Sequence, residues 1–193
     1  MRVLAFDIAY FSGWAATGPD GSSPVWGSFG IECDGENGLG RGLYNFRREV
    51  YQLIDFKKPD VLAWEKPLPG TKHLAAFDDY VRGAVGILRV FGFELDLECL
   101  ACDMKAVRKH FIGDGTRFDA KQQVFLRCKT LGYACANDDE SDAIATWDYA
   151  TGLLKARELA GRDIYGQTAT GGGGGQRSRR PVEARRIPGH RRL

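Results

Sequence analysis

Two short hydrophobic segments, each ending in a carboxylate, constrain the fold of this chain more than any other feature. Residues 3–7 read Val-Leu-Ala-Phe-Asp, and residues 60–65 read Asp-Val-Leu-Ala-Trp-Glu. Short apolar runs of this kind predict buried strands. In open α/β sheets, ligands bind beyond the carboxyl ends of the strands, so we expect Asp7 and Glu65 at that edge. A buried carboxylate costs free energy unless a cation or hydrogen bonds compensate it.

The segment between these two strands predicts two more strands and a helix. A strong turn signal, Gly-Pro-Asp-Gly, occupies residues 18–21, and an alternating apolar pattern resumes after it. We therefore expect three antiparallel strands joined by short turns over residues 2–31. Apolar residues then recur at helical spacing from Leu43 to Ile54, and Lys-Lys-Pro at 57–59 closes that helix.

The remaining elements complete an α/β pattern. After the strand at 60–65, the sequence predicts a strand over 94–101 and helices over 72–91, 103–112, 119–131 and 139–159. This order predicts an α/β domain with a mixed sheet, in which three antiparallel N-terminal strands precede the rest and helices flank the sheet.

The composition changes sharply near residue 165. Residues 166–193 contain seven Arg and one Glu, a formal charge of +6, which leaves −4 for residues 1–165. Five consecutive glycines occupy 171–175. We expect one folded domain over 1–165 and a Gly/Arg-rich disordered basic tail over 166–193. The tail either adds sequence-independent affinity for nucleic acid or is an inert extension.

The overall composition argues against a disordered, a membrane-spanning or a secreted protein. Hydrophobic residues make up 44% and aromatic residues 11%, enough for a packed core. Apolar runs stay shorter than the ~18–20 residues that a membrane span needs, and the N-terminus reaches Asp7 too early for a signal-peptide core. Five cysteines without an export signal predict reduced thiols. We expect a cytoplasmic protein that has no membrane partner.

A third group of acids precedes an apolar helix. Residues 137–142 read Asn-Asp-Asp-Glu-Ser-Asp. Asp139 and Asp142 are three residues apart and therefore share a helix face. Asp138 and Asp142 are four residues apart, which also allows a shared face, so Asp138 is an alternative to Asp139. Acids are favourable at a helix N-terminus, so a solvated cap is the alternative. Because Asp142 leads directly into an apolar stretch, at least one of these acids is expected to be partly buried.

Four acids from three distant segments suit a hard divalent cation. The candidate ligands are Asp7, Glu65, Asp139 and Asp142. Because they are all carboxylates and the chain has few histidines, they favour Mg²⁺ or Mn²⁺. Two such ions about 4 Å apart would activate a water and stabilise the leaving oxygen of a phosphodiester. The pattern therefore predicts a metal-dependent nuclease.

The order of three motifs resembles the RuvC-type Holliday junction resolvases of the ribonuclease H-like superfamily. The motifs are LAFDIAYFSGWA, VLAWEKP and DESDAIATW. The resemblance covers about residue 2 to residue 155. It implies a homodimeric, Mg²⁺-dependent endodeoxyribonuclease, with two ions per active site, that cuts four-way (Holliday) junctions in branched DNA by paired symmetric nicks. It assigns catalysis and metal binding to the four acids.

The same resemblance suggests residues that touch DNA. By position, Lys105 and Lys121 match family lysines that contact DNA phosphates or assist catalysis, and Lys121 is the candidate catalytic lysine. Arg82 lies in the long helix that forms much of the family's dimer interface, at an Arg-Gly step typical of the family. Where the family has an aromatic residue that reaches the junction centre, this chain has Leu68. After the first Asp, the family has Pro-Gly, whereas this chain has Ile8 and Ala9.

Two alternatives stay open at this point. One is a ribonuclease H-like nuclease that acts on other branched or flap DNA. The other is a noncatalytic protein that binds branched DNA, against which the four intact acids argue.

Overall fold

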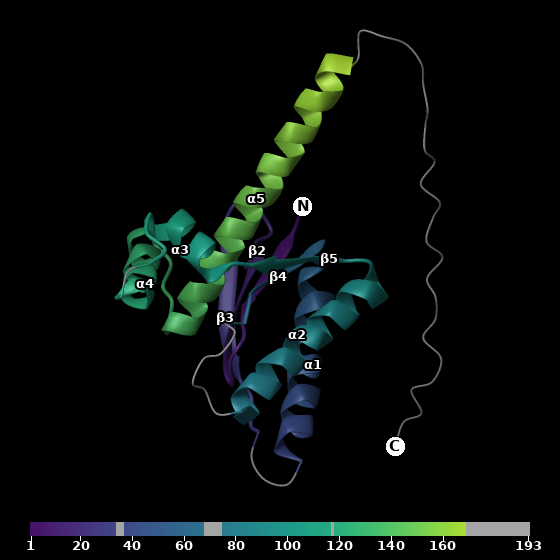
Figure 1. The fold of residues 1–193 in the computed structure, drawn as a ribbon, viewed down its shortest axis with the longest axis vertical. Coiled ribbons are helices and arrows are strands. Elements are labelled where there is room, and N and C mark those ends of the chain that lie inside the picture. Colours follow the sequence, from purple (N-terminus) through teal and green to yellow (C-terminus); the bar gives the residue numbers. More distant parts are fainter. Residues whose placement is uncertain (34–36, 68–74, 117, 169–193) are drawn as a thin grey trace. The chain divides into compact units, whose positions relative to one another are not determined.

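The computed structural model describes residues 1–33, 37–67, 75–116 and 118–168 (Figure 1). Leu68 and residues 169–193 of the predicted tail lie outside the described residues. The elements, in chain order, are β1 (Val3–Asp7), β2 (Phe11–Thr17), β3 (Pro24–Gly30), α1 (Gly38–Lys57), β4 (Val61–Glu65), α2 (Ala75–Leu95), β5 (Glu98–Cys102), α3 (Met104–Ile112), α4 (Ala120–Thr130) and α5 (Asp138–Thr168).

The chain divides into two units, Met1–Arg157 and Glu158–Leu193, with the division inside α5. The sheet, the core and the candidate site described below all lie in the first unit. Over the described residues, no helix combines the length and the apolar character that crossing a membrane requires.

The five strands form one mixed sheet in the order β3-β2-β1-β4-β5. β1 and β3 each pair antiparallel with β2, whereas β1, β4 and β5 run parallel to one another. The predicted α/β architecture with three antiparallel N-terminal strands is therefore confirmed. The parallel pairing places Phe6 beside Trp64 and so aligns the carboxyl ends of β1 and β4.

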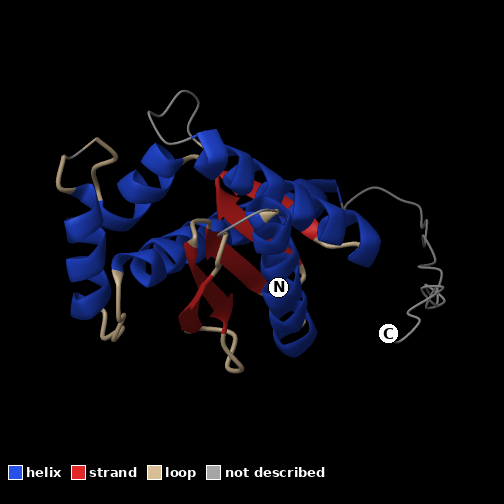
Figure 2. Cartoon of the chain, turned by 90° about the horizontal axis from the view of Figure 1, so that it is seen from below, coloured by secondary structure: helices blue, strands red, loops and turns tan. Residues whose placement is uncertain are grey.

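Period-two alternation in the central strands gives the sheet two buried faces. Leu4 and Phe6 pack with side chains of α1 and α2. Val3 and Ala5 pack on the opposite face with side chains of α3, α4 and α5. Helices therefore lie on both sides of the strands (Figure 2). Burial on both faces explains why β1 and β4 are continuous apolar runs.

Two predicted boundaries are wrong by several residues. The helix predicted to end at residue 91 continues to Leu95, so β5 begins at Glu98 instead of residue 94. Asp96, with φ 54°, ends the helical path, and the Leu97 amide donates to the Gly92 carbonyl at 2.9 Å. α5 continues to Thr168 instead of ending at residue 159; no proline interrupts it, and a helix tolerates interior glycine at about 1 kcal/mol each.

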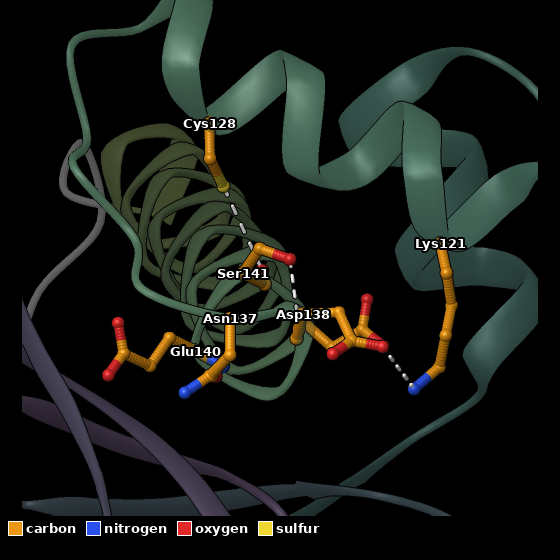
Figure 3. A network of polar contacts seen from close by, with 7 residues as sticks. Lys121, Cys128, Asn137, Asp138, Glu140 and Ser141 are labelled. Carbon is orange, nitrogen blue, oxygen red and sulfur yellow. Dashed lines mark hydrogen bonds and ion pairs between the residues drawn. The ribbon is translucent and has the colours of Figure 1, made fainter.

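The start of α5 is attached to β3 by a buried polar network. The Asn137 side chain accepts a hydrogen bond from the Glu140 amide at 2.9 Å. The Glu140 carboxylate in turn accepts from the Ala136 amide and from the Ser28 hydroxyl, both at 2.8 Å. This reciprocal arrangement resembles a capping box. Glu140 thus serves the structure of the turn, and Figure 3 shows it directed away from Lys121.

A glycine allows the same turn to lie directly on the sheet. Gly13 of β2 is opposite Asp7 in the β1–β2 ladder. A Cβ on Gly13 would lie 2.0 Å from the carbonyl oxygen of Asp139 and 2.9 Å from the amide nitrogen of Glu140. Real Cβ atoms do not approach backbone so closely, so residue 13 must be glycine for α5 to begin beside Asp7.

Gly13→Ala is expected to force the first turn of α5 away from β2 and to lower the free energy of unfolding by about 1–3 kcal/mol, the usual range for overpacking. Urea unfolding followed by circular dichroism measures the change. Gly86→Ala in α2 is the matched control, because a Cβ there meets nothing within 4 Å and helix propensity favours Ala by about 1 kcal/mol. Equal stabilities for the two variants would contradict the assigned contact.

Candidate active site

Strand alternation decides the direction in which the two strand-terminal acids point. Phe6 and Trp64 face α1 and α2, so the next residue of each strand, Asp7 and Glu65, faces the side of α3, α4 and α5. The two acids occupy the adjacent carboxyl ends of parallel strands. This is the edge at which open α/β sheets bind ligands.

The two acids share an open pocket of about 190 Å³ with residues from α2, α3, α4 and α5. α5 contributes Asp142, α4 contributes Lys121 and α3 contributes Arg108. Asp142 is buried, with 4% of its surface exposed. The structure therefore brings together four of the five predicted catalytic residues: Asp7, Glu65, Asp142 and Lys121.

Three carboxyl groups of this pocket, those of Asp7, Glu65 and Asp142, resist ionisation. Burial, together with the charges of Asp142 and Glu65, raises the pKa of Asp7 well above its ordinary value. Burial and the charge of Asp142 raise the pKa of Glu65 to about 7. Burial also raises the pKa of Asp142, although Lys121 and Arg108 act in the opposite direction. The acids are therefore close enough to repel one another in a place that water screens poorly.

Lys121 is the cation that balances part of this charge. Its ammonium lies 3.5 Å from a carboxylate oxygen of Asp142 and 3.4 Å from one of Asp138, as Figure 3 shows for Asp138. Burial alone would lower the pKa of Lys121, but the charges of Asp142, Asp7 and Asp138 outweigh burial and raise it. Lys121 therefore stays protonated over the physiological pH range.

The roles of the neighbouring aspartates differ. Asp138 is exposed and pairs with Lys121. Asp139 is partly buried; burial and the charge of Asp138 raise its own pKa, and its charge contributes to the raised pKa of Asp7. Asp139 does not line the pocket that holds Asp7 and Asp142. It lies near that pocket as the fourth predicted acid.

The donor set fits a hard divalent cation. The pocket offers carboxylate oxygens, which Mg²⁺ and Mn²⁺ prefer, and the mutual repulsion of these groups is what a divalent ion would relieve. Within the described ranges, no three His, Cys, Asp or Glu side chains are arranged as a formed metal cluster. In this arrangement Lys121 instead supplies the positive charge next to Asp142.

The other predicted DNA contacts are placed differently. Arg82 of α2 lines the same pocket, with Lys66 beside Glu65. Lys105 is exposed on α3 and does not line the pocket. Leu68 lies outside the described residues.

The sequence suggests Arg108 only as one of several basic residues that could contact phosphate, and the structure places its guanidinium in the pocket. It lines the cavity, and its charge acts on both Glu65 and Asp142. Its Nε atom is buried and, in the part of the chain that the structure describes, has no hydrogen-bond partner. The helical spacing was an available signal: Arg108 follows the buried Val107 on α3, which packs against the sheet, whereas Lys105 lies on the exposed side.

The turn after Asp7 is built without the Pro-Gly expected from the family pattern. The Ser12 hydroxyl donates to the Ala9 carbonyl at 2.6 Å, and the Ala9 amide donates to the Ser12 oxygen at 3.2 Å. This side chain closes the turn locally. Ile8 and Ala9 therefore leave Asp7 at the strand end.

Comparison with solved structures identifies the architecture. The chain superposes on Thermus thermophilus RuvC with a TM-score of 0.61 at 18% identity, over 79% of this chain and 96% of that one. It superposes on T. thermophilus RuvC in complex with Holliday junction substrate with a TM-score of 0.59 at 17% identity, over 76% and 90%. The fold is that of RuvC.

A viral structure shows the same arrangement less closely. The Fowlpox virus resolvase, solved with its substrate Holliday junction DNA, matches with a TM-score of 0.50 at 13% identity, over 80% of this chain and 99% of that one. No protein-family model and no curated protein sequence matches the chain. The RuvC likeness is therefore a likeness of fold, and it confirms the fold expected from the three motifs.

The raised pKa of Glu65 predicts how stability depends on pH in EDTA. The folded protein holds this proton up to about pH 7, whereas the ordinary value is 4.5. Its contribution to stability is thus full below about pH 4.5 and is lost as the pH rises to about 7, at most about 3 kcal/mol. Urea unfolding across this range measures the loss. Glu65→Gln is expected to flatten the dependence, whereas Asp55→Asn, at an exposed site, retains it; the same slope in Glu65→Gln would contradict the assignment.

Proposed function

We propose that this protein is a divalent-metal-dependent endodeoxyribonuclease that cuts four-way DNA junctions. The observation that carries the proposal is the convergence of Asp7, Glu65 and Asp142 with four cationic side chains in one open pocket. Solved resolvases with the same fold support it. Acids that resist ionisation together are a costly arrangement unless a cation binds them.

Asp7, Glu65 and Asp142 would hold Mg²⁺ or Mn²⁺, with Asp139 as the fourth acid. When bound, such ions supply a water of lowered pKa and neutralise charge on the phosphate. The donor chemistry supports a site for two ions, which four carboxylates would balance in charge.

The cations of the pocket would position the phosphodiester. Lys121 is protonated and adjoins Asp142, so its ammonium can pair with a nonbridging phosphate oxygen. Arg108 offers an unsatisfied N–H, and a guanidinium matches phosphate geometry with two parallel hydrogen bonds. Arg82 adds positive charge to the pocket wall. The exposed Lys105 would contact the DNA backbone farther from the scissile phosphate. These groups hold the phosphate while water attacks in line with the leaving 3′ oxygen, giving 5′-phosphate and 3′-hydroxyl ends.

Paired symmetric nicks require two such sites, and we include a homodimer in the proposal. α2 exposes an apolar set whose exposures are 49% for Val90, 91% for Phe93 and 40% for Leu95. Apolar groups gathered on one helix suit a protein interface better than water. A second copy of the chain, bound through α2, would cover them.

Nicking of a synthetic four-way junction, compared with linear duplex and flap DNA, tests the proposal. Cleavage is expected with Mg²⁺, absent in EDTA, and selective for the junction. Asp7→Asn is expected to lower the rate by at least about a hundredfold, the scale for loss of an electrostatic catalytic group, and to retain junction binding. Asp55→Asn is the matched control, because this carboxylate is exposed on α1.

Each other outcome has a defined meaning. Cleavage of flap DNA in preference to the junction would favour the alternative nuclease. Junction binding without Mg²⁺-dependent cleavage would favour the noncatalytic binder. Asp138→Asn and Asp139→Asn, compared side by side, identify which of the two serves catalysis.

Arg108→Ala is expected to lower kcat on the junction by about a hundredfold, because a buried donor to the reacting phosphate is lost. Lys109→Ala is the control, since Lys109 is exposed on the same helix and outside the pocket. Single-turnover kinetics at saturating enzyme separate this loss from weaker binding. Equal rates for the two variants would remove Arg108 from the mechanism.

A further inference from the structure

One side of α4 alternates aromatic and positively charged side chains. Phe118, two residues before the helix begins at Ala120, has a relative exposure of 104% and so buries none of its ring. Lys121, Phe125 and Lys129 follow at spacings of three or four residues, with side chains on one side of the helix. The buried residues of α4, Ala120, Val124 and Cys128, lie about 100° around the helix from these side chains, and Phe125 is itself partly buried against the core. We call Phe118, Lys121, Phe125 and Lys129 the α4 stripe.

This stripe leads directly out of the candidate active site. Lys121, Gln122, Phe125 and Asp138 line a second open pocket of about 370 Å³. Lys121 lines this pocket and the acidic pocket alike. At the far end, the Lys129 ammonium lies 4.4 Å from the centre of the Phe125 ring, a cation–π contact.

The chemistry of the stripe matches a single strand of nucleic acid. A strand without a partner offers base faces for stacking and phosphates for pairing with cations, in alternation. Phe118 provides a fully exposed ring, and Lys121 and Lys129 provide cations, with Lys129 placed over the partly buried ring of Phe125. Gln122 adds an exposed amide. Among the described residues that line this second pocket, the one acid is Asp138, which is paired with Lys121 at 3.4 Å, and this pairing reduces its repulsion of a phosphate.

A fully paired duplex would use this surface poorly. Its bases are stacked on one another and present only their edges in the grooves. A ring as exposed as that of Phe118 can stack only on a base whose face is free. The stripe therefore favours DNA in which nucleotides next to the scissile phosphate are unpaired.

We propose that the α4 stripe binds unpaired nucleotides of the branched DNA substrate, with a base stacked on Phe118 and phosphates next to Lys121 and Lys129, whose ammonium is held over the Phe125 ring. The inference rests on the proposed function and deepens it. It assigns recognition of the opened strand to α4 and so gives the exposed phenylalanine a role.

The test measures binding by the full-length Asp7→Asn protein at one fixed salt concentration. The probes are a branched DNA with a short unpaired thymidine segment at the branch point and a linear duplex of equal length. Adding Phe118→Ala is expected to weaken binding to the branched probe about tenfold, the loss typical of one stacked base, and to leave duplex binding within about twofold. Phe118→Tyr is expected to retain binding, because it keeps the ring.

Phe56→Ala is the matched control, because Phe56 is a similarly exposed phenylalanine, at 79%, on α1. A 2-aminopurine in the unpaired segment reports stacking directly: its fluorescence is expected to fall on binding, and to fall less with Phe118→Ala. Unchanged affinity and quenching in Phe118→Ala, or an equal loss on the duplex, would overturn the inference alone. Failure of the parent to prefer the branched probe would overturn the proposed function as well.

Discussion

Repulsion among the carboxyl groups of Asp7, Glu65 and Asp142 is the constraint to which the rest of this structure responds. Two of these acids are fixed by strand ends and cannot separate without breaking the parallel β1–β4 pairing. The third is held on α5 by the network of Asn137, Ser28 and Glu140. A rigid framework that holds like charges together favours the binding of a cation, because a multiply charged cation would reduce the repulsion among the carboxylates.

The two helical layers of the domain contribute differently to the core and to the candidate site. The face covered by α1 and α2 holds the large side chains of the core, such as Phe6, Phe46 and Trp64. On the other face, Ala5, Ala15 and Ala63 leave room for α5 to lie close to the strands. All the charged groups of the pocket except Arg82, Asp78 and Lys66 come from strand ends or from the α3–α5 layer. The large core side chains under α1 and α2 thus hold the strands in place, while the opposite layer and the strand ends supply most charged groups of the pocket.

Much of this arrangement could be predicted from residue patterns. Apolar runs ending in acids gave β1 and β4, and the spacing of Asp142 before an apolar stretch gave its burial. Boundaries set by backbone conformation were missed, as at Asp96, because an alternating run over 93–97 looks the same whether a helix or a strand begins it. The sequence could not distinguish Arg108 from the other basic candidates for phosphate contacts, because the position of one charged residue on α3 becomes clear only when the helix is packed against the sheet. The contact at Gly13 depends on two segments more than a hundred residues apart, and local sequence cannot reveal it.

That contact also limits how such a chain can diverge. The start of α5 lies against β2 through a contact of main chain on main chain, so no side chain separates the two elements at this point. A larger residue at position 13 would act as a spacer and shift the acids of the helix away from Asp7. The absence of a side chain at one position thus sets how near the carboxylates of two remote segments can come.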